Sequence, residues 1–231
     1  MLTGPHFSPG RLEAVRARIA AAERRAGRAP GSVRLLAVSK QQPLEAIVAA
    51  AEAGQLEFGE NYVQEGVAKV EALRGRPLTW HFIGRLQGNK TREVAEHFQW
   101  VHTVDRERIA TRLDVQRPPL APPLEVLLQV RLGEEPAKGG AAPAELPALA
   151  DAVSRLPRLK LRGLMCIPPP ARDEAAQRVP FRRLRELLEE LNQRGHALDV
   201  LSMGMSDDLE AAVLEGATLV RIGTAVFGPR T

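Results

Sequence analysis

The sequence predicts a parallel α/β fold, a single (β/α)8 TIM barrel preceded by an extra N-terminal helix. Eight short apolar runs recur along the 231 residues, and amphipathic segments of helical period separate them. Strands that are apolar throughout are typical of a parallel sheet, which is covered on both faces. Eight repeats of strand and helix favour closure into a barrel, although this pattern leaves an open, doubly wound sheet as the alternative.

The elements follow one another in a regular order. Residues 1–10 are expected to form a flexible leader, and residues 11–27 a helix, because Leu12, Val15 and Ile19 lie at helical spacing with arginines between them. The strands are predicted at 33–38, 56–58, 79–83, 100–104, 124–130, 161–165, 200–203 and 219–222. The helices between them are predicted at 43–53, 63–73, 91–98, 106–115, 145–156, 181–193 and 207–214.

The composition is that of one soluble domain over residues 1–231. The chain is 44% hydrophobic and 26% charged, and no apolar stretch approaches the ~20 residues that cross a bilayer. Its start lacks the charged segment and apolar core of a secretory signal. The single cysteine, Cys166, forms no internal disulfide. We therefore expect a cytoplasmic protein without a membrane partner.

The basic residues are spread along the chain. The formal net charge is +4, but the arginines occur within amphipathic segments and form no basic run with interleaved aromatic residues, so no nucleic-acid partner is expected. The five histidines are dispersed, and no metal site is predicted. Only five of the 32 basic residues are lysines: Lys40, Lys69, Lys90, Lys138 and Lys160. A lysine that closes an apolar strand is therefore distinctive.

Lys40 follows the first predicted strand, which places its amine at the carboxyl-end rim of the barrel. A lysine amine attacks an aldehyde only when it is neutral, and burial favours the neutral form. The alternative is a strand-end lysine that reaches into solvent. An amine and a phosphate site at the same rim of the barrel would together suit pyridoxal phosphate.

The loops after the last two strands predict such a phosphate site. Residues 202–208 read Ser-Met-Gly-Met-Ser-Asp-Asp, and Gly223-Thr224 follows the eighth strand. Small residues allow the backbone to approach phosphate oxygens, and hydroxyl groups donate to them. Ser206 has a second interpretation as a helix N-cap, with Asp207 and Glu210 as an acidic capping pair. Gly223 has a second interpretation as a simple turn residue.

Arg221 lies in an otherwise apolar strand and therefore needs a partner or a ligand. Opposite a pyridine nitrogen, a guanidinium would donate a hydrogen bond and leave that nitrogen unprotonated, which makes the ring a poor electron sink. The alternative is an ion pair with a barrel carboxylate such as Glu60. Asn61, after the second strand, is a candidate cofactor contact. His81, between two aromatic residues of a strand, is expected to be a core residue.

These segments resemble the pyridoxal phosphate homeostasis protein family, small vitamin B6-binding proteins with an alanine-racemase-like barrel. The resemblance covers nearly all of residues 33–228. The matching stretches are 36–40, 58–65, 80–90, 133–135, 202–208 and 220–228. Residues 129–132 and the proline-rich 166–170 depart from the family pattern. The resemblance implies a barrel of fold type III without the C-terminal β domain of the racemases, and pyridoxal phosphate (PLP) as cofactor.

The resemblance also implies roles for individual residues. It implies that Lys40 carries PLP as a Schiff base, that Arg221 faces its pyridine nitrogen, and that Ser202 or Ser206 holds its phosphate. Gly223 and Thr224 are implied in the same phosphate site, and Met203 is a further candidate contact. Family members are understood as carriers or regulators of PLP and amino-acid balance without established turnover. A carrier that serves PLP-dependent apoenzymes is the expected function.

Two enzymatic alternatives remain at this stage. A PLP-dependent amino-acid racemase needs acid and base groups on both faces of its substrate, and Tyr62 is the only tyrosine available for this. A cofactor-free enzyme acting on a phosphorylated metabolite needs a carboxylate base, such as Glu60 or Asp207. Because the dimerising β domain of the racemases is not expected, the protein is expected to be a monomer.

Overall fold

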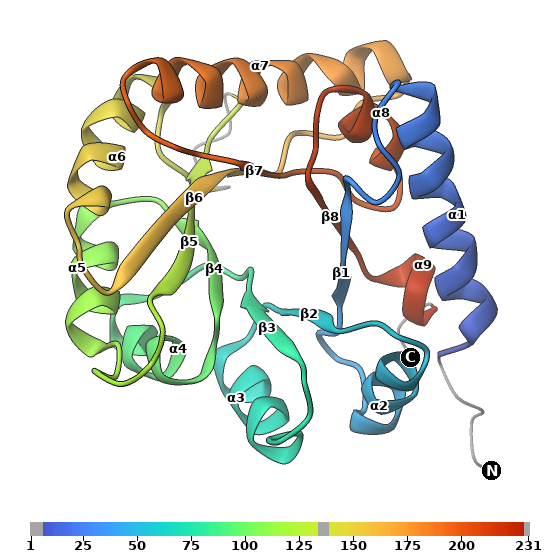
Figure 1. Cartoon of the computed structure of the whole chain (residues 1–231), viewed down its shortest axis with the longest axis horizontal. Helices are drawn as coiled ribbons and strands as arrows, with labels where there is room; N and C mark the ends of the chain where they lie inside the picture. Colours follow the sequence, from blue (N-terminus) through green and yellow to red (C-terminus); the bar gives the residue numbers. More distant parts are fainter. Residues whose placement is uncertain (1–6, 134–138, 229–231) are drawn as a thin grey trace.

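The strands form a closed parallel barrel, as Figure 1 shows for the computed structural model, which describes residues 7–133 and 139–228. Each strand pairs with the next, and β1 also pairs with β8, which closes the ring. The strands are β1 (Arg34–Val38), β2 (Glu57–Glu60), β3 (Thr79–Phe82), β4 (Trp100–Val104), β5 (Leu124–Val130), β6 (Leu159–Cys166), β7 (Val200–Ser202) and β8 (Leu219–Ile222). The predicted barrel is confirmed, and the open sheet is excluded.

Helices surround the barrel, and their apolar faces pack against the outside of the strands. They are α1 (Pro9–Arg25), α2 (Leu44–Glu52), α3 (Val63–Ala72), α4 (Thr91–His97), α5 (Glu107–Gln116), α6 (Leu146–Ser154), α7 (Glu174–Gln193), α8 (Leu209–Leu214) and α9 (Thr224–Phe227), with short 3-10 turns η1 (Gly88–Lys90) and η3 (Pro143–Glu145). None of the helices in the described ranges is long and apolar enough to cross a bilayer.

The observed elements differ from the predicted ones mainly at α7 and α9. Helix α7 begins at Glu174 rather than at residue 181, because the Asp173 carboxylate accepts a hydrogen bond from the Ala176 amide at 2.8 Å and caps it. The helix continues through Pro180, a residue that usually ends or kinks a helix. Helix α9 was not predicted, since four residues are too few to show a periodicity.

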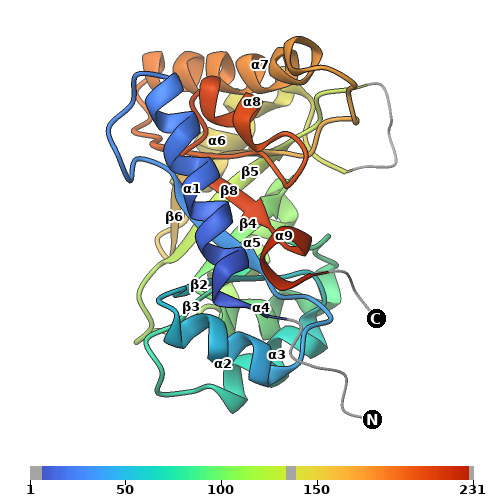
Figure 2. The same cartoon turned by 90° about the vertical axis from the view of Figure 1, so that its right-hand side faces the viewer.

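Helix α1 lies along the outside of the barrel against α8 and α9 (Figure 2). Phe7, just before this helix, is buried, and its ring lies 6.1 Å from the ring of Phe227 in α9. The predicted leader over residues 1–10 is therefore wrong for residues 7–10, which are held by this packing and by helix formation from Pro9. Residues 1–6 lie outside the described part of the chain.

Charged and aromatic side chains close the amino end of the barrel. Two guanidinium groups, those of Arg34 and Arg162, lie over the Trp100 ring, with their central carbons 5.2 and 5.3 Å from the ring centroid. Arg34 also pairs with Glu57 at 3.2 Å, and Arg162 pairs with Asp199 at 2.6 Å. These contacts fill the barrel interior at its amino end, so we expect a ligand to bind at the carboxyl end.

Candidate binding site at the carboxyl end of the barrel

A pocket of about 590 Å³ opens at the carboxyl end of the barrel. Most of the residues around it lie at the carboxyl ends of β1, β2, β7 and β8 or in the loops that follow them, and these strands are consecutive neighbours in the closed ring of Figure 1. It brings together most of the site residues predicted from the sequence, namely Lys40, Asn61, Ser206, Arg221, Gly223 and Thr224. Barrel closure is what makes these segments adjacent, because it sets β8 beside β1.

Lys40 lies in the loop directly after β1 and is half-buried at the wall of the pocket. The preceding residue fixes this loop, since the buried Ser39 hydroxyl donates to Glu60 Oε1 at 2.6 Å. The following residue, Gln41, has a φ of 60°, a left-handed conformation that is unfavourable for a residue with a side chain. The loop is thus held in one conformation on both sides of Lys40.

A buried lysine on α3 holds the same loop. The ammonium group of Lys69 has three N–H donors and meets three acceptors: the Ser39 carbonyl at 2.7 Å, Glu60 Oε1 at 2.9 Å and Glu65 Oε1 at 2.6 Å. Burial raises the pKa of the Glu60 carboxyl, and the charge of Lys69 opposes that rise. We call Ser39, Glu60, Glu65 and Lys69 the Lys69 clamp.

Arg221 reaches the pocket from inside the barrel. Its Nη1 donates to the Ser202 hydroxyl and its Nη2 to the Cys166 carbonyl, both at 2.8 Å. Both acceptors are neutral, and burial lowers the pKa of this guanidinium. The alternative ion pair between Arg221 and Glu60 is wrong, because Glu60 is bound in the Lys69 clamp. Among the described residues no carboxylate lies within ion-pair distance of Arg221, so its charge is available to a ligand.

The loop after β7 and the turn after β8 form the opposite wall. Ser206, Gly223 and Thr224 line the pocket there. Thr224 is the first residue of α9, and the first amides of a helix have no acceptor inside it. Hydroxyl groups and backbone amides therefore gather at one place, which is the composition of a phosphate site.

The interpretation of Ser206 as a helix N-cap is wrong. Helix α8 begins later, at Leu209, because the Asp208 carboxylate accepts from the Met205 amide at 2.6 Å and closes a turn over residues 205–208. The predicted capping residue Glu210 pairs instead with Arg18 of α1 at 2.8 Å. Ser206 is left at the pocket wall, where its carbonyl accepts from the same arginine at 2.9 Å.

Two of the predicted site residues lie outside the pocket. Ser202, the last residue of β7, is fully buried inside the barrel and contacts Arg221 rather than the pocket. Met203 is also fully buried, and its side chain belongs to the main hydrophobic core. The position of a residue in a motif that forms the pocket therefore does not decide whether its side chain reaches the pocket.

Asn61 presents an unsatisfied polar atom at the pocket. Its side-chain oxygen Oδ1 is buried and has no hydrogen-bond partner within the described residues. Its backbone packs tightly against Gly84, where an added Cβ would lie 2.0 Å from the Asn61 carbonyl oxygen. Only glycine at position 84 permits this approach, which sets the position of Asn61. A buried acceptor without a donor indicates a ligand that supplies one.

The sequence analysis did not single out several residues that line the pocket, among them Arg18, Ile83 and Ile167. Arg18 reaches it from α1, where one arginine among many gave no signal of a site. Its ion pair with Glu210 raises the pKa of the guanidinium and ties α1 to α8. Ile83 and Ile167 supply apolar walls. The side chain of Ile167 is 40% exposed, which is unusual for a large aliphatic residue.

Of the three groups that the enzymatic alternatives could use, one lies outside the pocket, one is engaged and one lines the pocket. The Tyr62 side chain is 52% exposed and does not line the pocket. The Glu60 carboxylate is bound in the Lys69 clamp, whereas Asp207 does line the pocket. His81 is fully buried, which confirms it as a core residue. No group of three or more potential metal ligands occurs in the described parts of the chain.

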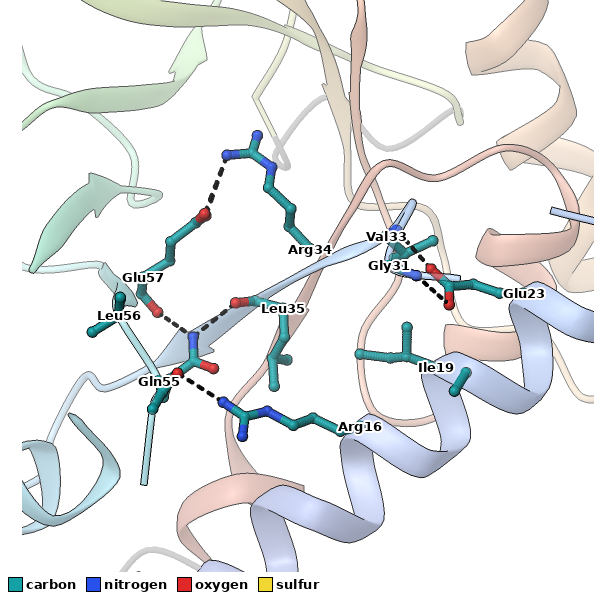
Figure 3. Close-up of a pocket in the computed structure, with 12 residues that line it drawn as sticks. Arg16, Ile19, Glu23, Gly31, Val33, Arg34, Leu35, Gln55, Leu56 and Glu57 are labelled. Atoms are coloured by element: carbon teal, nitrogen blue, oxygen red, sulfur yellow. Dashed lines mark hydrogen bonds and ion pairs between the residues drawn. The ribbon is translucent and has the colours of Figure 1, made fainter. Parts of the chain in front are cut away.

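A second cavity of about 380 Å³ lies at the amino end, between α1 and the starts of β1 and β2 (Figure 3). Its polar groups are paired with one another. Gln55 donates to the carbonyls of Leu35 and Glu57, both at 2.8 Å, and the Glu23 carboxylate accepts from the Val33 amide at 2.8 Å. These bonds join α1 to the barrel, and we assign this cavity a structural role.

Comparison with known proteins first defines the class. Residues 11–231 match the family model of the alanine racemase N-terminal domain. The alanine racemase of Corynebacterium glutamicum shares this fold with a TM-score of 0.68 at 18% identity, and the chain covers 61% of that longer protein. The chain is therefore a barrel of the alanine racemase N-terminal class.

More similar relatives define the family within this class. The pyridoxal phosphate homeostasis protein of Pseudomonas aeruginosa is 60% identical over 94% of this chain and 93% of the relative, and that of Escherichia coli (strain K12) is 54% identical over 95% of each. The structure of PipY from Synechococcus elongatus, solved with PLP bound, has a TM-score of 0.85 at 41% identity and covers 95% of this chain. The chain belongs to the pyridoxal phosphate homeostasis protein family.

Proposed function

We propose that this protein binds PLP, carries it as a Schiff base on Lys40, and serves PLP and amino-acid homeostasis without catalytic turnover of its own. One observation carries this proposal. Three kinds of group converge on a single pocket: an amine, a buried guanidinium that has no carboxylate partner among the described residues, and hydroxyl and amide donors. Lys40, Arg221 and Thr224 represent them. PipY, which was solved with PLP bound, supports the same ligand.

The pocket fits the chemical groups of PLP. Lys40 would hold the aldehyde carbon with release of one water, and Arg221 would donate to the ring nitrogen through an N–H that its two anchors do not use. Ser206, Gly223 and Thr224 would hold the phosphate. The unsatisfied Asn61 Oδ1 offers an acceptor to a donor on the ligand. The volume of about 590 Å³ suits a small cofactor.

The same residues favour a carrier over an enzyme. PLP supplies an aldehyde and, in enzymes, an electron sink that depends on a protonated ring nitrogen. A guanidinium at that nitrogen donates a hydrogen bond without transferring its proton, so Arg221 keeps the ring a weak electron sink. Tyr62, the only tyrosine, is 52% exposed and does not line the pocket, so it does not supply the second acid or base that the racemase alternative requires.

The test of this proposal uses the unmodified protein. The purified chain is mixed with PLP, the visible spectrum is recorded, the sample is reduced with borohydride, and the modified peptide is located by mass spectrometry. We expect a visible band and one reduced adduct, on Lys40. An adduct only on other lysines, or none, would contradict the proposal and favour the cofactor-free phosphate enzyme.

The phosphate site yields a separate prediction. Thr224→Val removes a hydroxyl while it keeps the shape of the side chain and the backbone amide. Because a hydrogen bond to a charged group contributes about 1.5–3 kcal/mol, we expect PLP to bind roughly 10- to 100-fold more weakly. Fluorescence titration with PLP and with pyridoxal, which lacks the phosphate, measures this. Pyridoxal binding should not change.

The matched control is Thr111→Val, which removes a hydroxyl that bonds the Glu107 carbonyl on α5, away from the pocket. Equal losses for PLP and pyridoxal in Thr224→Val would contradict the phosphate role.

We also propose that the protein is a cytoplasmic monomer and that PLP-dependent apoenzymes receive its cofactor. The buried free thiol of Cys166, whose pKa is raised to about 12 by burial, suits a reducing compartment. Light scattering of the PLP-loaded protein separates a monomer from a dimer.

A further inference from the structure

A line of polar side chains runs through the interior of the barrel below the pocket. Arg221 Nη1 lies 2.8 Å from Ser202 Oγ, that oxygen lies 3.0 Å from His102 Nδ1, and His102 Nε2 lies 3.0 Å from His81 Nδ1. These side chains come from β8, β7, β4 and β3, and all of them are buried. We call them the interior chain. Buried polar groups are costly unless each is satisfied, so their alignment needs an explanation.

Donor and acceptor chemistry gives the interior chain a single direction. A guanidinium only donates, so Ser202 Oγ accepts from Arg221. Among the described residues His102 Nδ1 is the one remaining hydrogen-bond partner of this buried hydroxyl, so we assign it as the acceptor of the Ser202 proton. With Nδ1 accepting, the neutral His102 carries its proton on Nε2 and donates it to His81 Nδ1. His81 then carries its proton on Nε2, which makes no hydrogen bond within the described residues and faces Glu57 Oε2 at 3.5 Å.

Both imidazoles are held neutral and fixed in orientation. Burial lowers the pKa of both histidines well below the ordinary value; the charge of Arg34 lowers both pKa values further, and that of Arg221 lowers the pKa of His102. Glu57 is the carboxylate that faces them, and it pairs with Arg34 at 3.2 Å. The His81 ring stacks on Trp100 with a centroid distance of 5.3 Å and an angle of 11°.

The interior chain acts on the pocket through Arg221. The guanidinium has two anchors, Ser202 Oγ on Nη1 and the Cys166 carbonyl on Nη2. Two anchors on different nitrogens fix the plane of the group, so its other N–H donors keep a constant direction at the pocket. His102 holds the first anchor in place, because it takes up the only hydroxyl proton of Ser202.

We propose that Ser202, His102 and His81 are positioning residues of the cofactor site, which hold Arg221 so that it donates to the ring nitrogen of PLP. This rests on the proposed function. It assigns the two histidines a role that does not involve proton transfer to a substrate, and it gives the buried Ser202 a task that is not phosphate binding.

The first test determines the protonation of the two histidines of the interior chain in the absence of cofactor. Long-range ¹H–¹⁵N NMR spectra of the imidazoles of the full chain report which ring nitrogen carries the proton. We expect the Nε2–H form for both His81 and His102 at neutral pH, with assignments from single histidine variants. An Nδ1–H form or a protonated ring at His102 would overturn the proposal, whether or not PLP binds.

The second test measures coupling to Arg221. His102→Phe should weaken PLP binding by about tenfold in the wild-type background, as the loss of one anchor of a charged hydrogen-bond donor does. In an Arg221→Lys background, the same substitution should change binding less than about twofold, because the guanidinium it positions is absent. An equal loss in both backgrounds would show a merely structural role and overturn the proposal.

Controls separate this proposal from the proposed function. Borohydride reduction should still mark Lys40 in His102→Phe, whereas failure of the wild-type protein to form that adduct would reject the proposed function alone. Ser202→Ala, a smaller change that removes the same anchor, repeats the coupling test if His102→Phe does not fold. His196→Gln, whose imidazole bonds Asp151 and Ser154 outside the barrel, should bind PLP as the wild type does.

Discussion

Lys40→Ala is expected to abolish the covalent attachment of PLP completely. The borohydride-reducible adduct at position 40 and the visible band of the Schiff base should both disappear, because alanine has no amine to condense with the aldehyde. Non-covalent binding should persist at lower affinity, since Arg221 and Thr224 remain in the pocket. Mass spectrometry after reduction, together with fluorescence titration, measures both quantities.

Lys160→Ala is the matched control for this result. Lys160 lies at the start of β6, at the amino end of the barrel, where it pairs with Glu125 at 3.4 Å. This variant should keep the full adduct on Lys40. A reducible adduct that survives in Lys40→Ala with wild-type yield would place the covalent site elsewhere and reject the assignment.

Lys69→Met is expected to produce the largest loss of stability. The substitution removes the cation between Glu60 and Glu65 and leaves the Glu60 carboxylate buried without a charged partner. Breaking a buried ion pair from one side costs about 3–5 kcal/mol in the free energy of unfolding. Urea denaturation at pH 7 measures this. The Lys40 loop should also loosen, so PLP binding should weaken in the same variant.

The pH dependence of this loss has a definite sign. Burial already raises the folded-state pKa of Glu60, and removal of Lys69 raises it further. Such a carboxyl stabilises the fold when it is protonated, and the stabilisation is lost as the pH rises through the folded-state pKa. The difference in stability between Lys69→Met and the wild type should therefore be smaller at pH 5.5 than at pH 8.

Two further variants test the cause of this instability. The double variant Glu60→Gln/Lys69→Met removes both charges and should be more stable than Lys69→Met alone. Lys90→Met removes a lysine from a more exposed pair with Glu93, and should cost less than about 1 kcal/mol. A double variant less stable than the single one would show that the unpaired charge is not the cause.

The sequence alone predicted most of the elements and most of the residues that the structure brings together in the pocket. Apolar runs and helical periods are local patterns, so they were enough to locate the strands and to show that the first strand ends shortly before Lys40. The order of the motifs placed Arg221 in the last strand and Thr224 directly after it, where barrels of this type hold phosphate. These predictions depend on neighbours within a few residues, which the chain itself displays.

Only the tertiary structure decided which side chains meet across the barrel. Closure of β8 on β1 excluded the open sheet, and α1 brought Arg18 to the pocket. The partner of Glu60 is Lys69 rather than Arg221. His102 contacts Ser202 and so becomes part of the interior chain below the pocket. These pairings depend on strand register and side-chain direction between segments far apart in sequence, and no local pattern of residues encodes that geometry.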